Sequence, residues 1–259
     1  MPPYVELEHR WADGTGTSGN RAVGRRPAVF ELDIRRHLEN DLLSKHVQQK
    51  VQGRIRAGMI CAVWIGAPCN SFSRARDRPG GPTPLRSDEC PKGLAELSEK
   101  DSRKVLEGNE LARISIAVFH ECRSWKIAAV IENPHSSRLW CMPAFKHARS
   151  IRHVEFNWTD FCQDGTPWRK RTAFLSTGLV FGVRLKSDFA RTMRQCSARG
   201  ACSRTGKPHQ PLRGIQASSG RYFTILAEPY PKRLCKRMAE LFATARSEQC
   251  APLPQSCLD

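Results

Sequence analysis

The pattern of apolar and polar residues predicts a sheet whose strands alternate with helices. Apolar runs at 59–65 and 127–131 are each followed by polar residues, which is typical of buried parallel strands that carry functional side chains at their carboxyl ends. Between them, residues 98–125 have an apolar stripe at helical spacing, and Ser98 can cap this helix. Strand, helix and strand then form a right-handed βαβ unit if the sheet is parallel.

Weaker periodic segments surround this unit. The pattern predicts a strand at 28–34, a helix at 35–57, a short crossover at 136–147, strands at 154–158 and 174–177, and a helix at 229–244. A loop rich in glycine and proline at 77–84 is expected to be mobile. We therefore expect an α/β domain with a mainly parallel sheet over residues 1–186, followed by a small basic, cysteine-containing region at 187–259.

Composition narrows the class of protein. A hydrophobic content of 40% in 259 residues supports a real core, while the mean hydropathy of −0.49 indicates much polar surface. No apolar run approaches the roughly 20 residues of a membrane span, and the first residues lack the layout of a signal peptide. We expect a nuclear or cytoplasmic protein that is not secreted, with its eleven scattered cysteines as reduced thiols.

The charge is strongly positive and unevenly spread. The net charge is +17, and the segment 169–237 holds sixteen basic residues against two acidic ones, Asp188 and Glu228, so that it carries +14. A basic segment beside an α/β site fits binding to a phosphate backbone. A solvated basic face is the alternative interpretation.

Cys69 and Glu132 are the candidate reactive pair. Cys69 lies where the first apolar strand gives way to a turn, and Glu132 directly follows the second. A cysteine thiolate is a strong nucleophile once its pKa is lowered, and we expect the nearby cations Arg74 and Arg76 to favour it. A thiol and an acid suit covalent attack on an electron-poor ring. A buried structural cysteine is the alternative, since the chain has ten others.

Three stretches resemble, in the same order, motifs of DNA cytosine-5 methyltransferases. Pro-Cys-Asn-Ser-Phe-Ser at 68–73 resembles Pro-Cys-Gln-x-Phe-Ser, and Glu-Asn-Pro at 132–134 resembles Glu-Asn-Val. Gly-Thr-Pro-Trp-Arg-Lys-Arg at 165–171 resembles Gly-Val-Pro-Gln-x-Arg-x-Arg, although Trp168 stands where glutamine belongs and only Lys170 falls in register with an arginine. The resemblance implies a Rossmann-like methyltransferase fold.

The resemblance also implies a mechanism. A cytosine is flipped out of DNA and Cys69 adds to carbon 6 of its ring. Glu132 hydrogen-bonds ring nitrogen 3 and stabilises the charge that develops there, and carbon 5 takes a methyl group from S-adenosylmethionine. Asn133 braces the loop around Cys69, while Arg169 and Arg171 hold the base or its phosphates.

The same resemblance places the cofactor near the amino-terminal strands. The candidate cofactor-binding residues are Gly14, Gly16, Glu31, Asp33, Asp41 and Pro68. Glu31 or Asp33 would hold the ribose hydroxyls and Asp41 the adenine amine. The Gly14-x-Gly16 turn would cradle the cofactor, or else belongs to a flexible arm.

DNA is the expected partner, and no membrane is expected to be one. The chain is expected to be a monomer or part of a larger polyprotein. The alternative is a catalytically inactive relative that binds nucleic acid, either by itself or as part of a mobile-element polyprotein.

A cysteine and histidine cluster raises the question of a metal. Cys196, Cys202 and His209 could bind zinc with Cys162 or Cys235 as a fourth ligand, but structural zinc sites favour tighter spacing. The sequence alone therefore leads us to assign no metal, and a zinc-stabilised binding module stays a third interpretation.

Overall fold

A six-stranded sheet with helices on both faces forms an α/β fold. The computed structural model describes residues 4–9, 28–34, 37–79, 81–178, 193–197, 200–216 and 219–249. The strands are β1 (Tyr4–His9), β2 (Ala28–Leu32), β3 (Ile60–Gly66), β4 (Ala128–Pro134), β5 (Glu155–Asp160) and β6 (Arg171–Thr177), in the order β2-β1-β3-β4-β6-β5. The helices are α1 (Lys45–Arg56), α2 (Glu99–Ser124), α3 (Pro143–Ser150) and α5 (Lys232–Gln249).

The sheet is mixed, so the prediction of a mainly parallel sheet is wrong. Among the described strands, β3 pairs with β4 in parallel, whereas the pairs β1–β2, β1–β3, β4–β6 and β5–β6 are antiparallel. Parallel neighbours need a long crossover, and α2 supplies it between β3 and β4. The short segment 161–170 between β5 and β6 reverses the chain instead.

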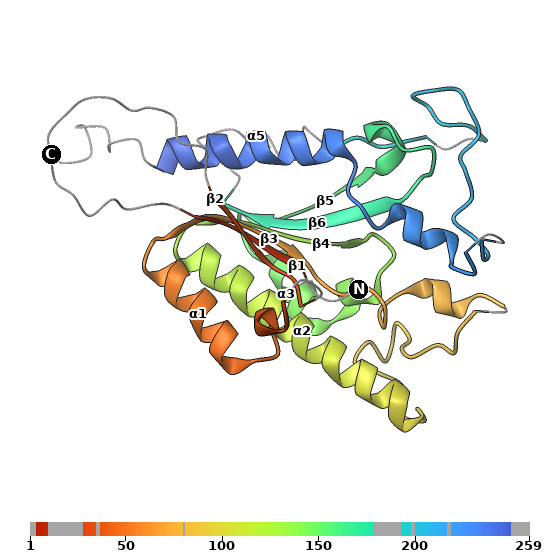
Figure 1. Cartoon of the computed structure of the whole chain (residues 1–259), viewed down its shortest axis with the longest axis horizontal. Helices are drawn as coiled ribbons and strands as arrows, with labels where there is room; N and C mark the ends of the chain where they lie inside the picture. The colour runs from red at the N-terminus through yellow and green to blue at the C-terminus, as the bar shows by residue number, and fades with distance from the viewer. Residues whose placement is uncertain are drawn as a thin grey trace, which may run out of the picture.

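The sheet has two cores, because α1, α2 and α3 cover one face and α5 covers the other (Figure 1). Val63 and Ile65 of β3 pack toward α1, α2 and α3, whereas Ala62 and Trp64 pack toward α5 on the opposite face. This alternation follows from the two-residue period of a strand. Within the described residues, no helix is both long and apolar enough to cross a membrane.

Local signals predict α2 better than α1. The Ser98 hydroxyl accepts a hydrogen bond from the Asp101 N–H at 3.2 Å and caps α2 as expected. The predicted helix 35–57 is shorter, because a 3₁₀ turn, η1 (Leu38–Asn40), precedes it. Asp41 Oδ1 then accepts a hydrogen bond from the Leu43 N–H at 2.9 Å, which favours a turn over a helix.

Helix α5 completes the second core. The sequence assigned it to a separate region beginning at residue 187, but its apolar face packs on the sheet. Leu234, Met238 and Phe242 form one buried cluster with strand residues that include Trp64 and Phe174. This core therefore combines residues from both sides of the predicted boundary.

Replacing Leu234 with alanine tests this packing. Leu234 is 1% exposed, so Leu234→Ala should lower the free energy of unfolding by about 2–5 kcal/mol through lost burial and a cavity. Chemical denaturation followed by circular dichroism measures this change. The control Leu106→Ala, at a helix residue that is 67% exposed, should change it by no more than about 0.5 kcal/mol. Equal effects of the two substitutions would show that α5 does not pack on the sheet.

Candidate active site

The parallel pair β3–β4 brings the predicted reactive residues together. Gly66 of β3 is in register with Glu132 of β4, and Cys69 follows three residues later. The buried Asn133 donates a hydrogen bond from Nδ2 to the Ala67 carbonyl at 2.7 Å. The side chain of Asn133 thus joins the end of β4 to the segment that leads into Cys69.

Glu132 is buried at the end of a directed hydrogen-bond chain. The Trp64 indole donates from Nε1 to the Tyr230 hydroxyl at 3.3 Å, and that hydroxyl donates to Glu132 Oε2 at 2.9 Å. Glu132 Oε1 is also buried and has no hydrogen-bond partner among the described residues. Burial raises the pKa of Glu132, although the charge of Lys170 and the Tyr230 hydrogen bond act against this. The carboxyl group therefore keeps its proton to higher pH than an exposed glutamate.

Cys69 lies in the same electrostatic environment. Burial raises the pKa of the half-buried Cys69, the negative charge of Glu132 raises it further, and Lys170 lowers it. The expectation that Arg74 and Arg76 favour the thiolate is not met. Arg74 donates to the Ser136 carbonyl at 2.9 Å and Arg76 to the Asn70 carbonyl at 3.3 Å, so both guanidinium groups hold the loop instead.

A buried arginine fixes the loop that carries Cys69 to α2. Arg86 is 1% exposed and donates to the Ser71 carbonyl, at 3.2 Å, and to the Ser71 hydroxyl, at 3.0 Å. Its guanidinium carbon lies 3.8 Å from the centre of the Phe72 ring. Burial lowers the pKa of Arg86 to about 10. Gly108 of α2 permits this approach, because a Cβ there would lie 2.5 Å from the Ser71 hydroxyl oxygen.

An ion-pair network fixes the other side of this loop. Arg138 makes two hydrogen bonds of 2.8 Å to the Asp77 carboxylate and one of 3.2 Å to Asp88. Arg74 also pairs with Asp88, at 2.5 Å. The sequence predicted a mobile loop at 77–84, and the structure ties its first residue, Asp77, to Arg138 in the segment that follows β4.

Arg169 and Arg171, which were predicted to hold the base or its phosphates, form ion pairs with Asp160. Arg169 and Arg171 donate from Nε to Asp160 Oδ1 at 3.0 and 3.2 Å. Burial alone would raise the pKa of Asp160, but hydrogen bonds from Arg171, from the Cys196 N–H and from Arg169 hold it below its usual value. The Arg169 and Arg171 side chains are 30% and 36% exposed, respectively. Lys170, between them in sequence, is the cation whose charge acts on Cys69 and Glu132.

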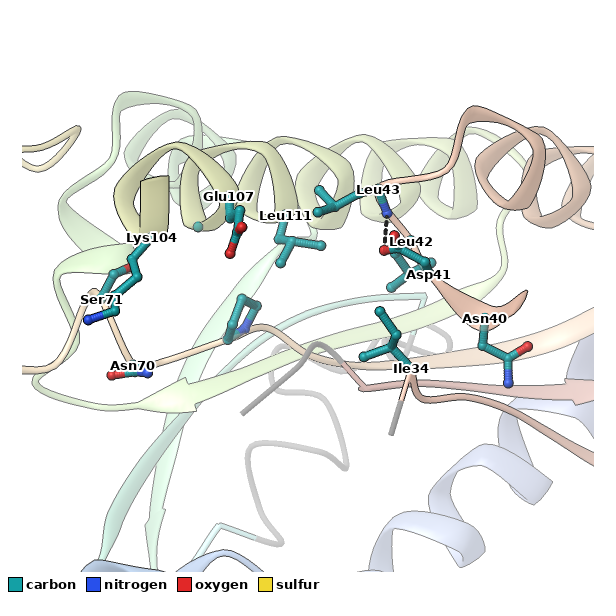
Figure 2. Close-up of a pocket in the computed structure, with 12 residues that line it drawn as sticks. Ile34, Asn40, Asp41, Leu42, Leu43, Asn70, Ser71, Lys104, Glu107 and Leu111 are labelled. Carbon is teal, nitrogen blue, oxygen red and sulfur yellow. Dashed lines mark hydrogen bonds between the residues drawn. The ribbon is translucent and has the colours of Figure 1, made fainter. Parts of the chain in front are cut away.

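A cavity of about 260 Å³ lies on the α2 side of the Cys69 loop (Figure 2). Two predicted cofactor residues, Asp41 and Pro68, line it. Ile34, Leu42, Leu43 and Leu111 form an apolar part of the wall, and Lys104 and Glu107 of α2 add charged groups. Because Pro68 and Asn70 line the cavity, the intervening Cys69 connects it to the Glu132 side of the loop.

Glu31 and Asp33, two further predicted cofactor residues, do not line this cavity. Glu31 lies in β2 and Asp33 directly after it, and neither is among the described residues that line the cavity, although Ile34 is. Asp33 is buried and its carbonyl accepts a hydrogen bond from the His37 N–H at 3.2 Å. Gly14 and Gly16 lie outside the described residues.

Sequence reasoning missed Tyr230 and Trp64 and undervalued Lys170. Tyr230 comes from the segment before α5, 98 residues beyond the glutamate that it contacts. No local motif identifies Tyr230, although Trp64 in the buried β3 predicts a hydrogen-bond acceptor for its indole N–H. Lys170 carried a signal, because it is the basic residue in register with the resembled motif.

Four metal-ligand side chains converge on the edge of the domain. The Sγ atoms of Cys162, Cys196 and Cys202 and a ring nitrogen of His209 all lie within 4.8 Å of one another. The three cysteines are buried and none forms a disulfide, whereas Cys235 lies exposed on α5. The fourth member of the cluster is therefore Cys162 and not Cys235.

Comparison with protein-family models, with curated proteins and with solved structures finds no match to this chain. Its function is therefore inferred from the geometry and from the resemblance of its motifs.

Opposite charge changes beside Cys69 should move its reactivity in opposite directions. Glu132→Gln removes a negative charge that raises the pKa of Cys69, so more thiolate forms at a fixed near-neutral pH. Lys170→Met removes a positive charge and should have the reverse effect. We expect alkylation of Cys69 by iodoacetamide to become faster and slower, respectively, by up to about tenfold, which corresponds to one pKa unit.

Peptide mass spectrometry measures the rate at each thiol, and the exposed Cys90 serves as an internal control whose rate should not change. Parallel changes at Cys69 in both variants would contradict the electrostatic assignment.

Proposed function

We propose that this protein transfers a methyl group from S-adenosylmethionine to carbon 5 of cytosine in DNA through a covalent adduct with Cys69. The proposal rests on one observation above all. A buried carboxyl group raises the pKa of a thiol near the ends of two parallel strands, and a cavity opens on the other side of the same loop. The family resemblance of 68–73 and 132–134 supports the same reaction.

The hydrogen-bond chain from Trp64 through Tyr230 orients the Glu132 carboxyl group for the proton donation that this reaction needs. Burial raises the pKa of Tyr230 well above its usual value, so its hydroxyl keeps its proton and donates to Glu132 Oε2. A proton on the carboxyl group is then carried by Oε1, the buried oxygen without a described partner. From there it can be donated to ring nitrogen 3 of a cytosine placed against it. A buried carboxyl that takes up a proton is an efficient hydrogen-bond donor in a dry site.

The nucleophile and the acid are electrostatically coupled. Ionised Glu132 disfavours the Cys69 thiolate, so moving one proton from the thiol to the carboxylate removes the repulsion between them. It leaves a thiolate and a protonated acid, with Lys170 favouring the remaining negative charge. Sulfur then forms a bond to carbon 6, ring nitrogen 3 receives the proton of Glu132, and carbon 5 becomes nucleophilic. Once carbon 5 has accepted its new substituent, loss of the carbon 5 proton to a base, departure of sulfur as thiolate and return of the ring nitrogen 3 proton to Glu132 restore the aromatic ring.

The mixture of apolar and charged groups in the cavity wall suits S-adenosylmethionine. Its apolar wall suits a flat base, the second oxygen of Asp41 can accept from an adenine amine, and Lys104 and Glu107 suit the charged ends of an amino acid. When bound, S-adenosylmethionine would supply the methyl group that carbon 5 accepts. The position of Pro68 and Asn70 in the wall places this cofactor site beside the candidate nucleophile.

A nucleic-acid-binding protein without catalysis is the second candidate. The net charge of +17 supports binding to a phosphate backbone whether or not methyl transfer takes place. Cys69 with its raised pKa and the engagement of Arg169 and Arg171 by Asp160 favour this candidate over an enzyme with a preformed thiolate.

Calorimetry with S-adenosylhomocysteine tests the cofactor cavity. Asp41→Ala should weaken binding by about 10-fold to 100-fold, the effect of one hydrogen bond to a charged group. Glu96→Ala, at an exposed residue outside the cavity, should leave the affinity unchanged. If Asp41→Ala binds as well as the wild type, the cofactor does not occupy this cavity.

Duplex DNA that contains 5-fluorocytosine tests the reaction. Fluorine at carbon 5 cannot leave as a proton, so the adduct cannot collapse, and a band that resists denaturing electrophoresis should form in the presence of S-adenosylmethionine. Glu132→Gln should slow its formation by about 10²-fold, on the order of one charge-stabilising contact in a dry site. Tyr230→Phe should slow it by about tenfold, because one hydrogen bond to the carboxyl group is lost.

Cys69→Ser should abolish the adduct, whereas Cys90→Ser, at an exposed thiol, should not affect it. An adduct that persists in Cys69→Ser would overturn the mechanism. DNA binding by the wild type without any adduct would establish the second candidate.

A further inference from the structure

We propose that Cys162, Cys196, Cys202 and His209 bind one structural Zn²⁺ ion. Their four ligand atoms lie within 4.8 Å of one another, although the residues are spread over 48 positions of the chain. The site is separate from the Cys69–Glu132 pair, and its existence does not depend on the proposed methyl transfer.

The ligand set and the spacing match zinc in particular. Zinc takes four ligands in a tetrahedron, with bonds of about 2.3 Å to sulfur and about 2.0–2.1 Å to histidine nitrogen, which places neighbouring ligand atoms roughly 3.5–3.8 Å apart. Cys196 Sγ lies 3.7 Å from His209 Nε2. Three cysteines and one histidine form a common structural zinc set, and soft thiolate ligands disfavour magnesium and calcium. The four protein ligands leave no open position, so the ion is structural.

Polar groups around the sulfur atoms support a metal over a simple thiol cluster. The Ser203 N–H and hydroxyl lie 3.4 and 3.5 Å from Cys196 Sγ and donate to it. Gln163 Nε2 lies 3.6 Å from Cys162 Sγ and 3.8 Å from Cys202 Sγ. Donors aimed at sulfur stabilise thiolates and orient metal ligands. An apolar core gives thiols no such donors.

A tight turn presents two of the ligands. The Cys202 carbonyl accepts hydrogen bonds from the N–H groups of Thr205, at 3.2 Å, and Gly206, at 2.8 Å. Gly206 has a φ of +68°, a left-handed conformation that glycine adopts without strain. The chain thereby reverses and returns His209 to the side of Cys202. This local geometry makes up for the wide sequence spacing that argued against zinc.

The ion would attach the segment 196–209 to the sheet. Cys162 belongs to η4 (Phe161–Asp164), the 3₁₀ turn that directly follows β5, whereas the other ligands come from 196–209. Two further contacts join the same parts, from Arg204 Nε to the Cys162 carbonyl at 2.7 Å and from the Cys196 N–H to Asp160 at 2.8 Å. Zinc with three thiolates carries one negative charge, which the Arg204 side chain beside it can offset.

Metal analysis of the wild-type chain is the direct test. The protein is purified under reducing conditions without chelator and without a histidine tag, and zinc is measured by plasma mass spectrometry. We expect one zinc ion per chain, and a lower melting temperature once the ion is removed. After exchange with Co²⁺, the protein should show the visible bands of tetrahedral cobalt and thiolate-to-cobalt charge transfer.

Substitutions identify the ligands. Cys202→Ser and His209→Ala should each lose zinc, and His209→Cys should keep it because cysteine restores a fourth ligand. Cys235→Ser is the matched control and should keep the full amount. A disulfide among the three cysteines, or wild-type protein without zinc whose thiols all react with an alkylating agent, would overturn the proposal, as would zinc loss in Cys235→Ser. Because the wild-type result needs no variant, poor folding of a substituted chain does not obscure the answer.

Discussion

The parallel pairing of β3 with β4 is the constraint on which the candidate site depends. It aligns Gly66 with Glu132, so the chain that leaves β3 must pass beside the carboxyl group that ends β4. The hydrogen bond from Asn133 to the Ala67 carbonyl fixes that passage from the side of β4. The Cys69 thiol, two residues beyond Ala67, then lies where Glu132 and Lys170 both act on its pKa. The remaining described strands pair antiparallel and flank β3 and β4 in the sheet.

Cations hold the polypeptide between the two strands in place. Arg86 satisfies backbone and hydroxyl oxygens from inside the protein, at the cost of a lowered pKa, and Arg138 binds two aspartates on the opposite side. Since a buried guanidinium without its partners would be strongly unfavourable, the loop has one well-defined course. Pro68 and Asn70 line the cavity and Cys69 lies between them, so this loop would separate the proposed cofactor site from the proposed nucleophile.

The carboxyl-terminal third of the chain contributes residues to the candidate site. Helix α5 covers the second face of the sheet, and the segment before it brings Tyr230 to Glu132. The proposed zinc ion would anchor the intervening basic segment to the end of β5. Each face of the sheet has its own core, and in the proposed reaction the nucleobase and the cofactor would approach from different faces.

The sequence by itself located the main strands and helices and placed Cys69 and Glu132 at neighbouring strand ends. Helical and strand periodicity located β3, α2 and β4, the cap at Ser98 was evident, and the motifs at Cys69 and Glu132 lie at neighbouring strand ends. Tertiary structure alone decided the strand directions, the position of α5 on the sheet, the contact of Tyr230 with Glu132, the pairing of Arg169 and Arg171 with Asp160, and the choice of Cys162 over Cys235. The reason is physical. Periodicity and capping depend on residues a few positions apart, whereas those contacts join distant segments whose meeting is set by how the whole chain packs its two cores.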